Sequence, residues 1–338
     1  MGLNKVATIG DVAARAGVAR GTVSNYFNHP DKVAEATRVR IESAIEALSF
    51  VRNSQARMLA SGRSATVGLL VTDIGNSFFV DIARGAEEGA QRAGYSLLLA
   101  NSDNAATKED LYLQLFDEER FAGILLAPFE SSTDALTRLR SRGRRVVLLN
   151  VHGDERQGCS VAVDNEYGGY IAARHLIEQG RKRIAFLGGP DRLEPLLERR
   201  LGVERAIGEA GGGVTLEEIR VTAVNTPQGR VVGRALAARP PRERPDAIVA
   251  ASDLLALGVV QEIFPTLGVP GDIAVIGYDN NSAAHESRVP ISTVAQPGHE
   301  LGSTAAGLLA DELENPAEHQ HRNLRLRPHL LVRASTRI

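Results

Sequence analysis

The spacing of apolar residues near the start of the chain predicts two short helices joined by a tight turn. Between residues 8 and 28, apolar or small side chains recur at three- and four-residue intervals, and Gly17 interrupts the pattern. Thr8 can cap the first helix, and Asp11 three residues later can complete a capping box. The segment is therefore predicted to be a helix-turn-helix, followed by a third amphipathic helix over residues 33–48.

The second of these helices presents polar side chains suited to reading DNA. Val23 takes the core position, whereas the outward positions hold short polar groups and one guanidinium that can hydrogen-bond to base edges in a major groove. The residues of this head expected to contact DNA are Thr8, Arg20, Gly21, Thr22, Ser24, Asn25 and Asn28. Three-helix domains of other kinds share the pattern, so the motif alone leaves a purely structural unit open.

From residue 66 the pattern changes to short, near-continuous apolar runs separated by amphipathic stretches. Runs such as 67–72 and 183–189 are typical of parallel strands buried on both faces, with helices in between. The alternation starts again after residue 165, which predicts two doubly wound α/β lobes. Chain crossings between the lobes are expected at 160–165, 291–297 and 325–333.

The motifs of the head, taken with this alternation, resemble the LacI type (lactose/galactose repressor) of transcription factor. The chain carries TI-x-DVA-x-x-AGV from Thr8, TVS from Thr22 and N-x-x-A-R-x-L from Asn53, and the resemblance extends to about Arg337. It implies an all-α helix-turn-helix head plus two parallel-sheet α/β lobes of periplasmic-binding-protein type. The implied limits are 1–50 for the head, 51–65 for a hinge linker and 66–338 for the core, with one lobe at about 66–162 and 293–324 and the other at about 163–292 and 325–338.

The hinge linker is expected to contact DNA as well. A helix of this length is marginal in isolation, because helix nucleation is unfavourable in water. Two such segments of a dimer could instead fold against each other in the minor groove of a palindromic site, each inserting Leu59 between base pairs. The expected contacts are Asn53, Ala56, Arg57 and Leu59. The alternative for Leu59 is packing against the head.

An effector is expected in the cleft between the lobes, because ligands of open α/β sheets bind beyond the carboxyl ends of the strands. Carboxylates and guanidinium groups there can hold paired hydroxyls, and an aromatic ring can cover the apolar face of a sugar. Strand-end positions and the resemblance together give the expected contacts Asp73, Phe78, Phe79, Asp164, Arg199, Ser252 and Asp279. Structural alternatives remain: packing for one of the phenylalanines, a helix cap for Asp253, and a surface role for Arg200 beside Arg199.

Departures from the family pattern refine these expectations. Ala19 and Ala34 stand where capping side chains are usual, and such a loss costs about 1 kcal/mol. Asn25 replaces the commoner arginine, which shifts the expected base contact towards adenine. Valine at 224 and the absence of tryptophan favour a sugar over a flat nucleobase. No leucine heptad follows Arg333, so we expect a dimer without an added four-chain bundle.

The distribution of charge fits a DNA-binding head joined to a core that does not itself attract nucleic acid. Residues 1–63 carry nine Lys or Arg against five acidic residues, a balance of +4, and the whole chain carries −2, so the remainder carries −6. The single cysteine, Cys159, is expected to be an idle thiol, and no histidine spacing is typical of a metal site. No nucleotide-binding or catalytic motif is present, so we expect no cofactor, no metal and no enzyme activity.

Taken together, these features predict a ligand-responsive repressor that binds palindromic operator DNA as a homodimer. Its effector, a small sugar or sugar derivative, is expected to change the angle between the lobes and thereby the spacing of the two hinges. The chain has no leader and no apolar membrane segment, which favours the cytoplasm and excludes a membrane partner. The alternative is a sugar-binding protein of periplasmic type without a DNA-binding role. The basic head and the missing leader count against it.

Overall fold

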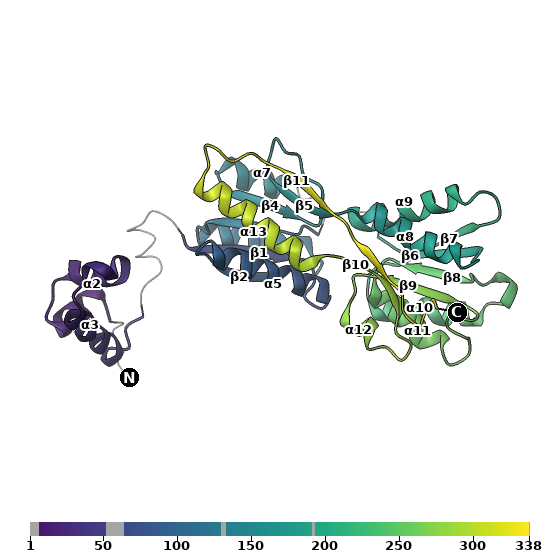
Figure 1. The fold of residues 1–338 in the computed structure, drawn as a ribbon, viewed down its shortest axis with the longest axis horizontal. Helices are drawn as coiled ribbons and strands as arrows, with labels where there is room; N and C mark the ends of the chain where they lie inside the picture. The colour runs from purple at the N-terminus through teal and green to yellow at the C-terminus, as the bar shows by residue number, and fades with distance from the viewer. Residues whose placement is uncertain (1–6, 52–63, 130–132, 191–192, 338) are drawn as a thin grey trace. The chain divides into compact units, whose positions relative to one another are not determined.

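The computed structural model describes residues 7–51, 64–129, 133–190 and 193–337. It divides into two compact units, residues 1–64 and 65–338 (Figure 1). Among the described residues, none of the helices combines the length and the apolar character that a membrane crossing needs.

The first unit is a small helical domain, as predicted. It contains α1 (Ile9–Ala16), α2 (Arg20–Asn28), the 3-10 turn η1 (Pro30–Lys32) and α3 (Glu35–Ala47). Thr8 and Asp11 form the predicted capping box, and Gly17 ends α1 with a φ of 63°, a conformation that glycine adopts without strain. Ala19 and Ala34 provide no side-chain cap, also as predicted. Val23 and Ile41 lie fully buried in the shared core.

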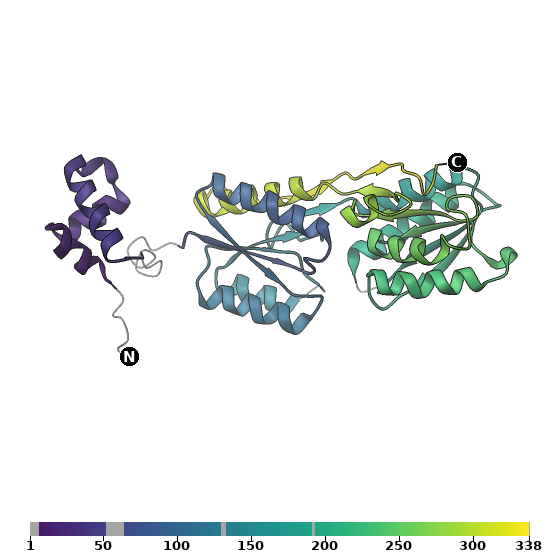
Figure 2. The ribbon, with the colours of Figure 1, turned by 90° about the horizontal axis from the view of Figure 1, so that it is seen from below.

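The second unit begins with an α/β lobe, here called the N-lobe. Its six parallel strands lie in the order β11-β5-β4-β3-β1-β2. The strands are β1 (Thr66–Val71), β2 (Ser96–Asn101), β3 (Gly123–Leu126), β4 (Arg145–Leu149), β5 (Ser160–Val163) and β11 (Asn323–Leu326). The helices are α5 (Ser77–Arg92), α6 (Ala106–Glu118), α7 (Thr133–Ser141) and α13 (Gly298–Glu314). Figure 2 shows α5 and α13 on one face of the sheet and α6 and α7 on the other, each pair packed on its own apolar cluster.

The other lobe, here called the C-lobe, has a second six-stranded sheet in the order β12-β10-β9-β8-β6-β7. Its strands are β6 (Arg183–Gly188), β7 (Thr215–Arg220), β8 (Ala247–Ala250), β9 (Ala274–Tyr278), β10 (Ser292–Ala295) and β12 (His329–Leu331). Its helices are α8 (Asn165–Glu178), α9 (Glu194–Glu209), α10 (Thr226–Ala238), η2 (Pro241–Glu243), α11 (Asp253–Ile263) and α12 (Ser282–His285). The predicted pair of doubly wound lobes is confirmed, with one exception: the edge strand β12 runs antiparallel to β10.

The chain crosses between the lobes after β5, after β10 and between β11 and β12 (Figure 1). These crossings fall within the three expected segments, but the limits of the lobes shift by a few residues. Residues 293–295, expected in the N-lobe, lie in the C-lobe because β10 pairs with β9. Residues 325–326, expected in the C-lobe, lie in the N-lobe because β11 pairs with β5.

Several elements of the C-lobe were not predicted from the sequence, among them β7, α10 and α12. The edge strand β7 has the sequence TLEEIR, and its two central glutamates interrupt the apolar run that would predict a strand. The helix α10 follows β7 in the chain. The helix α9 begins at Glu194, with Pro195 in its first turn, a position that proline favours. Arg199 and Arg200 therefore lie in the second turn of α9.

Candidate functional site

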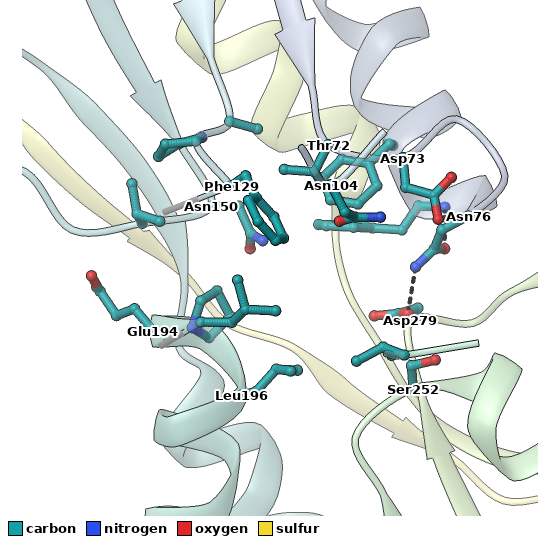
Figure 3. A pocket seen from close by; sticks show the side chains of 18 of the residues that line it. Thr72, Asp73, Asn76, Asn104, Phe129, Asn150, Glu194, Leu196, Ser252 and Asp279 are labelled. Atoms are coloured by element: carbon teal, nitrogen blue, oxygen red, sulfur yellow. Dashed lines mark hydrogen bonds between the residues drawn. The ribbon is translucent and has the colours of Figure 1, made fainter. Parts of the chain in front are cut away.

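A cavity of about 320 Å³ lies between the two lobes of the second unit, beyond the carboxyl ends of the strands (Figure 3). All but one of the expected effector residues line it, namely Asp73, Phe78, Phe79, Arg199, Ser252 and Asp279. The exception is Asp164. Its carboxylate caps α8 by accepting a hydrogen bond from Tyr167 N at 3.0 Å, and Arg325 Nη1 lies 3.8 Å away. The cap holds Asp164 at the start of a helix and outside the cavity lining.

Asp279 is held by donors from both lobes. Its carboxylate accepts a hydrogen bond from Asn76 Nδ2 at 2.8 Å (Figure 3). It also accepts a hydrogen bond from Gln296 Nε2 at 2.7 Å. Asn76 belongs to the N-lobe, where its side chain caps α5. Burial raises the pKa of Asp279, and the positive charge of Arg199, whose Nη1 lies 3.6 Å from Oδ1, opposes that rise. The carboxylate thus links the lobes at one side of the cavity.

Arg199 lines the cavity from a fixed position on α9. Its Nε donates to Asn165 Oδ1 at 2.9 Å, and its Nη1 donates to the carbonyl oxygen of Ala251 at 2.6 Å. The guanidinium also lies over the ring of Tyr278, with 3.7 Å between its carbon and the ring centroid. Arg200, by contrast, pairs with Glu204 and Glu218 away from the cavity. The structure thereby separates two neighbouring arginines that the sequence left as alternatives.

Ser252, and not Asp253, is the residue that caps α11. The Ser252 hydroxyl accepts a hydrogen bond from Leu254 N at 3.1 Å, and the residue also lines the cavity. Asp253 is buried in the first turn of α11, where its Oδ2 accepts from Asn281 N at 2.7 Å. Burial, together with the neighbouring charge of Asp279, raises the pKa of Asp253 well above its usual range. Asp253 is therefore a buried structural carboxyl next to the cavity.

Three phenylalanines contribute to the apolar part of the lining. Phe78 is buried in the N-lobe core, and Phe79 is half-buried with its ring centroid 5.3 Å from that of Phe78. Phe129, which the sequence analysis did not single out, lines the cavity beyond the end of β3. Its place just after an apolar strand was the signal that could have identified it. The rings supply flat apolar surfaces of the kind that cover a sugar or a base.

Several polar residues of the lining were also missed, namely Thr72, Asn76, Asn104, Asn150, Glu194 and Asn225. Asn150 follows β4 directly, so the strand-end rule applied to Asp73 could have found it. Its Oδ1 is buried and has no hydrogen-bond partner among the described residues. Buried polar atoms are rarely left unpaired in folded proteins, so this oxygen is available to a ligand hydroxyl or N–H group. Figure 3 shows Asn150 beside Phe129 at the cavity wall.

A second contact between the lobes is formed by His152, in the loop after β4. Its backbone N donates to Glu194 Oε1 at 3.0 Å, and its Nε2 lies 3.0 Å from Glu198 Oε1. Arg325 Nη2 lies 3.0 Å from the same ring nitrogen. Glu198 raises the pKa of His152 above the usual 6.5, while burial and the charge of Arg325 act in the opposite direction. The protonated imidazole therefore stabilises this arrangement of the lobes.

We expect this contact to make the lobe arrangement depend on pH. Because the pKa of His152 is raised in the contact, the contact strengthens as the pH falls and weakens as the pH rises through the raised pKa. Small-angle X-ray scattering of the ligand-free protein between about pH 6 and pH 8 should show more compact particles at the lower pH. His152→Gln should remove that difference. A pH dependence that survives in His152→Gln would exclude His152 as its source.

The first unit presents the expected DNA-contacting residues on its surface. Arg20, Gly21, Asn25 and Asn28 are exposed on α2, Thr22 and Ser24 are half-buried, and Thr8 is exposed at the start of α1. The guanidinium of Arg20 lies against Gly10, since a Cβ at residue 10 would come within 2.5 Å of its Nη2. The expected hinge contacts Asn53, Ala56, Arg57 and Leu59 lie outside the described residues.

Comparisons with known proteins match both units. Residues 8–53 match the family described as bacterial regulatory proteins, lacI family, and residues 173–336 match a periplasmic binding protein-like domain. The chain is 32% identical over 335 residues to the HTH-type transcriptional repressor PurR of Photobacterium profundum, covering 98% of this chain and 99% of that protein.

Solved structures resemble the whole chain as well. One is a complex of the transcriptional regulator CelR with cellobiose, with a TM-score of 0.72, 30% identity, and coverage of 97% of this chain and 99% of that one. Another is the lac repressor dimer bound to operator and the anti-inducer ONPF, with a TM-score of 0.83, 23% identity, and coverage of 99% and 100%. The second likeness concerns the fold alone.

Proposed function

Because the chain belongs to the LacI family of bacterial regulatory proteins, a family of transcription regulators and not of enzymes, we propose that it is a repressor controlled by a small effector. It binds palindromic operator DNA as a homodimer in the cytoplasm, and a sugar-like effector in the cavity between the lobes alters its DNA affinity. One observation carries this proposal: a single chain combines an exposed recognition helix with a cavity whose two walls belong to different lobes.

The chemistry of the cavity supports a polyhydroxylated effector. Asp73 and Glu194 offer carboxylate acceptors, Asn104 and Asn225 offer amides that both donate and accept, and Phe129 offers a flat apolar surface. Sugars present this combination of paired hydroxyls and apolar ring faces. The cellobiose in the CelR complex shows a sugar bound to a protein of similar sequence. A flat nucleobase is the competing effector chemistry, because it too could lie against a phenylalanine ring.

Exposed apolar side chains on the N-lobe support a dimer. Leu98 and Leu99 on the edge strand β2 are each 45% exposed, and Leu111 on the following helix α6 is 62% exposed. Large apolar groups gathered on one edge of a soluble domain are typical of a surface that another protein covers. A second copy of the chain is the occupant proposed here, because a palindromic site requires a two-fold symmetric protein.

Fluorescence anisotropy with palindromic DNA tests the proposal. The full chain should bind a matching palindrome with an affinity that falls by orders of magnitude as salt is raised, because phosphate contacts release counterions. Asn25→Ala should weaken specific binding by about 5- to 150-fold, the loss expected for one two-bonded base contact of 1–3 kcal/mol. Ser43→Ala, an exposed change on α3, is the matched control and should bind like the unmodified chain.

The same titration, repeated with candidate effectors, tests the sugar. One member of a panel of pentoses, hexoses and disaccharides should change the DNA affinity and also raise the melting temperature by mass action. A response to purine bases alone would show that the effector is a nucleobase and not a sugar, and the proposal of a repressor would stand. Binding to a sugar without DNA binding at any salt concentration would instead favour a sugar-binding protein without a DNA-binding role.

A further inference from the structure

Three side chains with metal-ligating atoms meet in the N-lobe, away from the effector cavity. Cys159 immediately precedes β5, and His319 and His321 lie in the loop that leads from α13 to β11. The Sγ of Cys159 lies 3.2 Å from His319 Nε2 and 3.8 Å from His321 Nδ1. These three atoms lie within 4.8 Å of one another. The pairing of β5 with β11 brings the cysteine to histidines that are distant in sequence.

The spacing of these atoms matches that of ligands around a tetrahedral zinc ion. Zinc bonds of about 2.3 Å to sulfur and about 2.0–2.1 Å to nitrogen place the sulfur and nitrogen ligands about 3.6 Å apart. The two observed distances, 3.2 and 3.8 Å, lie on either side of that value. Little rearrangement would therefore be needed to receive an ion.

The surroundings of the cluster orient its first histidine as a metal ligand. His319 Nδ1 lies 2.7 Å from Asp311 Oδ2, so the carboxylate fixes the proton on Nδ1 and leaves the lone pair of Nε2 facing the sulfur. A carboxylate behind a histidine ligand is the usual arrangement in zinc sites. The backbone N of Arg322 also donates to Cys159 Sγ at 3.3 Å, which suits a sulfur that carries negative charge.

Burial gives the cluster a closed side and an open side. Cys159 is 0% exposed, and the side chain of His319 is 2% exposed. His321 is only half-buried, so an ion can enter beside it and keep water as a fourth ligand. The buried carboxyl of Glu312, which acts electrostatically on Cys159, adds negative charge nearby. Negative charge this close to the cluster attracts a cation and offsets the cost of removing the ion from water.

We propose that Cys159, His319 and His321 form a binding site for Zn²⁺ or a similar borderline-soft divalent ion. A thiolate with two imidazoles selects such ions over Mg²⁺ and Ca²⁺, which prefer oxygen ligands. On binding, the thiol releases its proton to solvent, and a sulfur–metal bond forms with no change of oxidation state. Without an ion, Cys159, His319 and Asp311 form a chain of hydrogen bonds from thiol to imidazole to carboxylate.

The position of the site suggests what the ion does. Because β1, β5 and β11 run parallel in one sheet, the amino-terminal ends of these strands lie on the same side of the sheet. Cys159 and His321, which precede β5 and β11, therefore lie on the side where β1 begins, directly after residues 64 and 65. The effector cavity lies at the opposite, carboxyl edge of the same strands. An ion would therefore fasten the loop between α13 and β11 to β5, and would stabilise the N-lobe independently of the effector.

Titration of the full, metal-free chain with Co²⁺ tests the site. One Co²⁺ per chain should bind with near-ultraviolet absorption from thiolate-to-cobalt charge transfer, and Zn²⁺ should displace it and raise the melting temperature. Cys159→Ser and His321→Gln should each lose the absorption band. Asp311→Asn should keep the band but weaken binding by about 10- to 100-fold, the usual effect of removing a carboxylate behind a histidine ligand.

Two controls separate this site from other histidines. His329→Gln changes an exposed histidine of the C-lobe and should bind Co²⁺ like the unmodified chain. His152→Gln removes a second cluster of possible ligands, in which His152 lies with Glu194 and Glu198, and should also leave the band intact. Absence of the band in the unmodified chain would overturn the proposal. So would Zn²⁺-induced stabilisation that persists in Cys159→Ser, provided that variant keeps the far-ultraviolet circular dichroism of the parent.

Discussion

Replacing Arg199 with methionine is expected to lower the free energy of unfolding by about 3–5 kcal/mol, because it removes the partner of a buried charge. Asp279 is buried, and the Arg199 guanidinium lies 3.6 Å from its carboxylate. The replacement also removes the hydrogen bonds that Arg199 donates to Asn165 Oδ1 and to the carbonyl oxygen of Ala251. Since Arg199 lines the cavity, effector affinity should fall with stability. Denaturant unfolding and an effector titration measure the two effects.

Arg200→Met is the matched control for this change. It removes an arginine from the next position of the same helix, but its partners Glu204 and Glu218 are partly exposed, so we expect a loss of about 1 kcal/mol or less. A loss of the same size in both variants would mean that Arg199 contributes only helix packing. Normal effector affinity in Arg199→Met would remove it from the binding site.

The loss in free energy of unfolding caused by Arg199→Met should become smaller as the pH is lowered. The pKa of Asp279 is already raised by burial, and the loss of the nearby positive charge should raise it further. A carboxyl whose pKa is higher in the folded than in the unfolded state binds its proton more tightly when folded, so lowering the pH through that pKa favours folding. Unfolding curves of both proteins at two pH values, such as pH 5 and pH 8, provide the comparison.

Gly202→Ala is expected to destabilise the protein by about 1–3 kcal/mol, the usual range for overpacking. A Cβ at residue 202 of α9 would lie 1.9 Å from the carbonyl oxygen of Glu166 on α8. The contact is reciprocal, since a Cβ on Gly169 of α8 would lie 1.9 Å from the carbonyl oxygen of Arg199. Backbone atoms cannot move aside as side chains do, so the two helices would have to separate.

Gly208→Ala provides the control on the same helix. A Cβ at residue 208 has nothing within 4 Å, so the change should stabilise the protein by up to about 1 kcal/mol through helix propensity alone. The two substitutions are chemically identical and should have opposite signs in denaturant unfolding. Stabilisation by both would show that α8 and α9 can separate without loss. Because α9 carries Arg199, Gly202→Ala should also weaken effector binding.

Local patterns in the sequence were sufficient for the head and for the general plan of the lobes. The capping box of Thr8 and Asp11, the left-handed turn at Gly17 and the uncapped Ala19 each depend on residues only a few positions apart. Apolar runs likewise marked most strands, because strands buried on both faces need apolar residues at successive positions. Where that condition fails, as in the half-exposed edge strand β7, apolar runs do not reveal the strand.

The strand-end rule placed most of the expected effector residues at the cavity, although the rule takes no account of side-chain contacts. It depends on parallel strands sharing one carboxyl edge, so it locates a residue by its place in the chain alone. It could not show that Asp164 is used as a helix cap, or that Asn76 reaches across the lobes to Asp279. Those outcomes depend on which groups face each other after folding.

The sequence by itself therefore determined the helix-turn-helix, the double alternation of strands and helices, and the strand ends beyond which the cavity lies, because each follows from short-range periodicity and capping. Only the tertiary structure decided which of Arg199 and Arg200 faces the buried carboxylate of Asp279. It alone brought Cys159 to His319 as well. Both outcomes arise from packing between segments far apart in the chain, and such contacts cannot be predicted from the spacing of residues along the sequence.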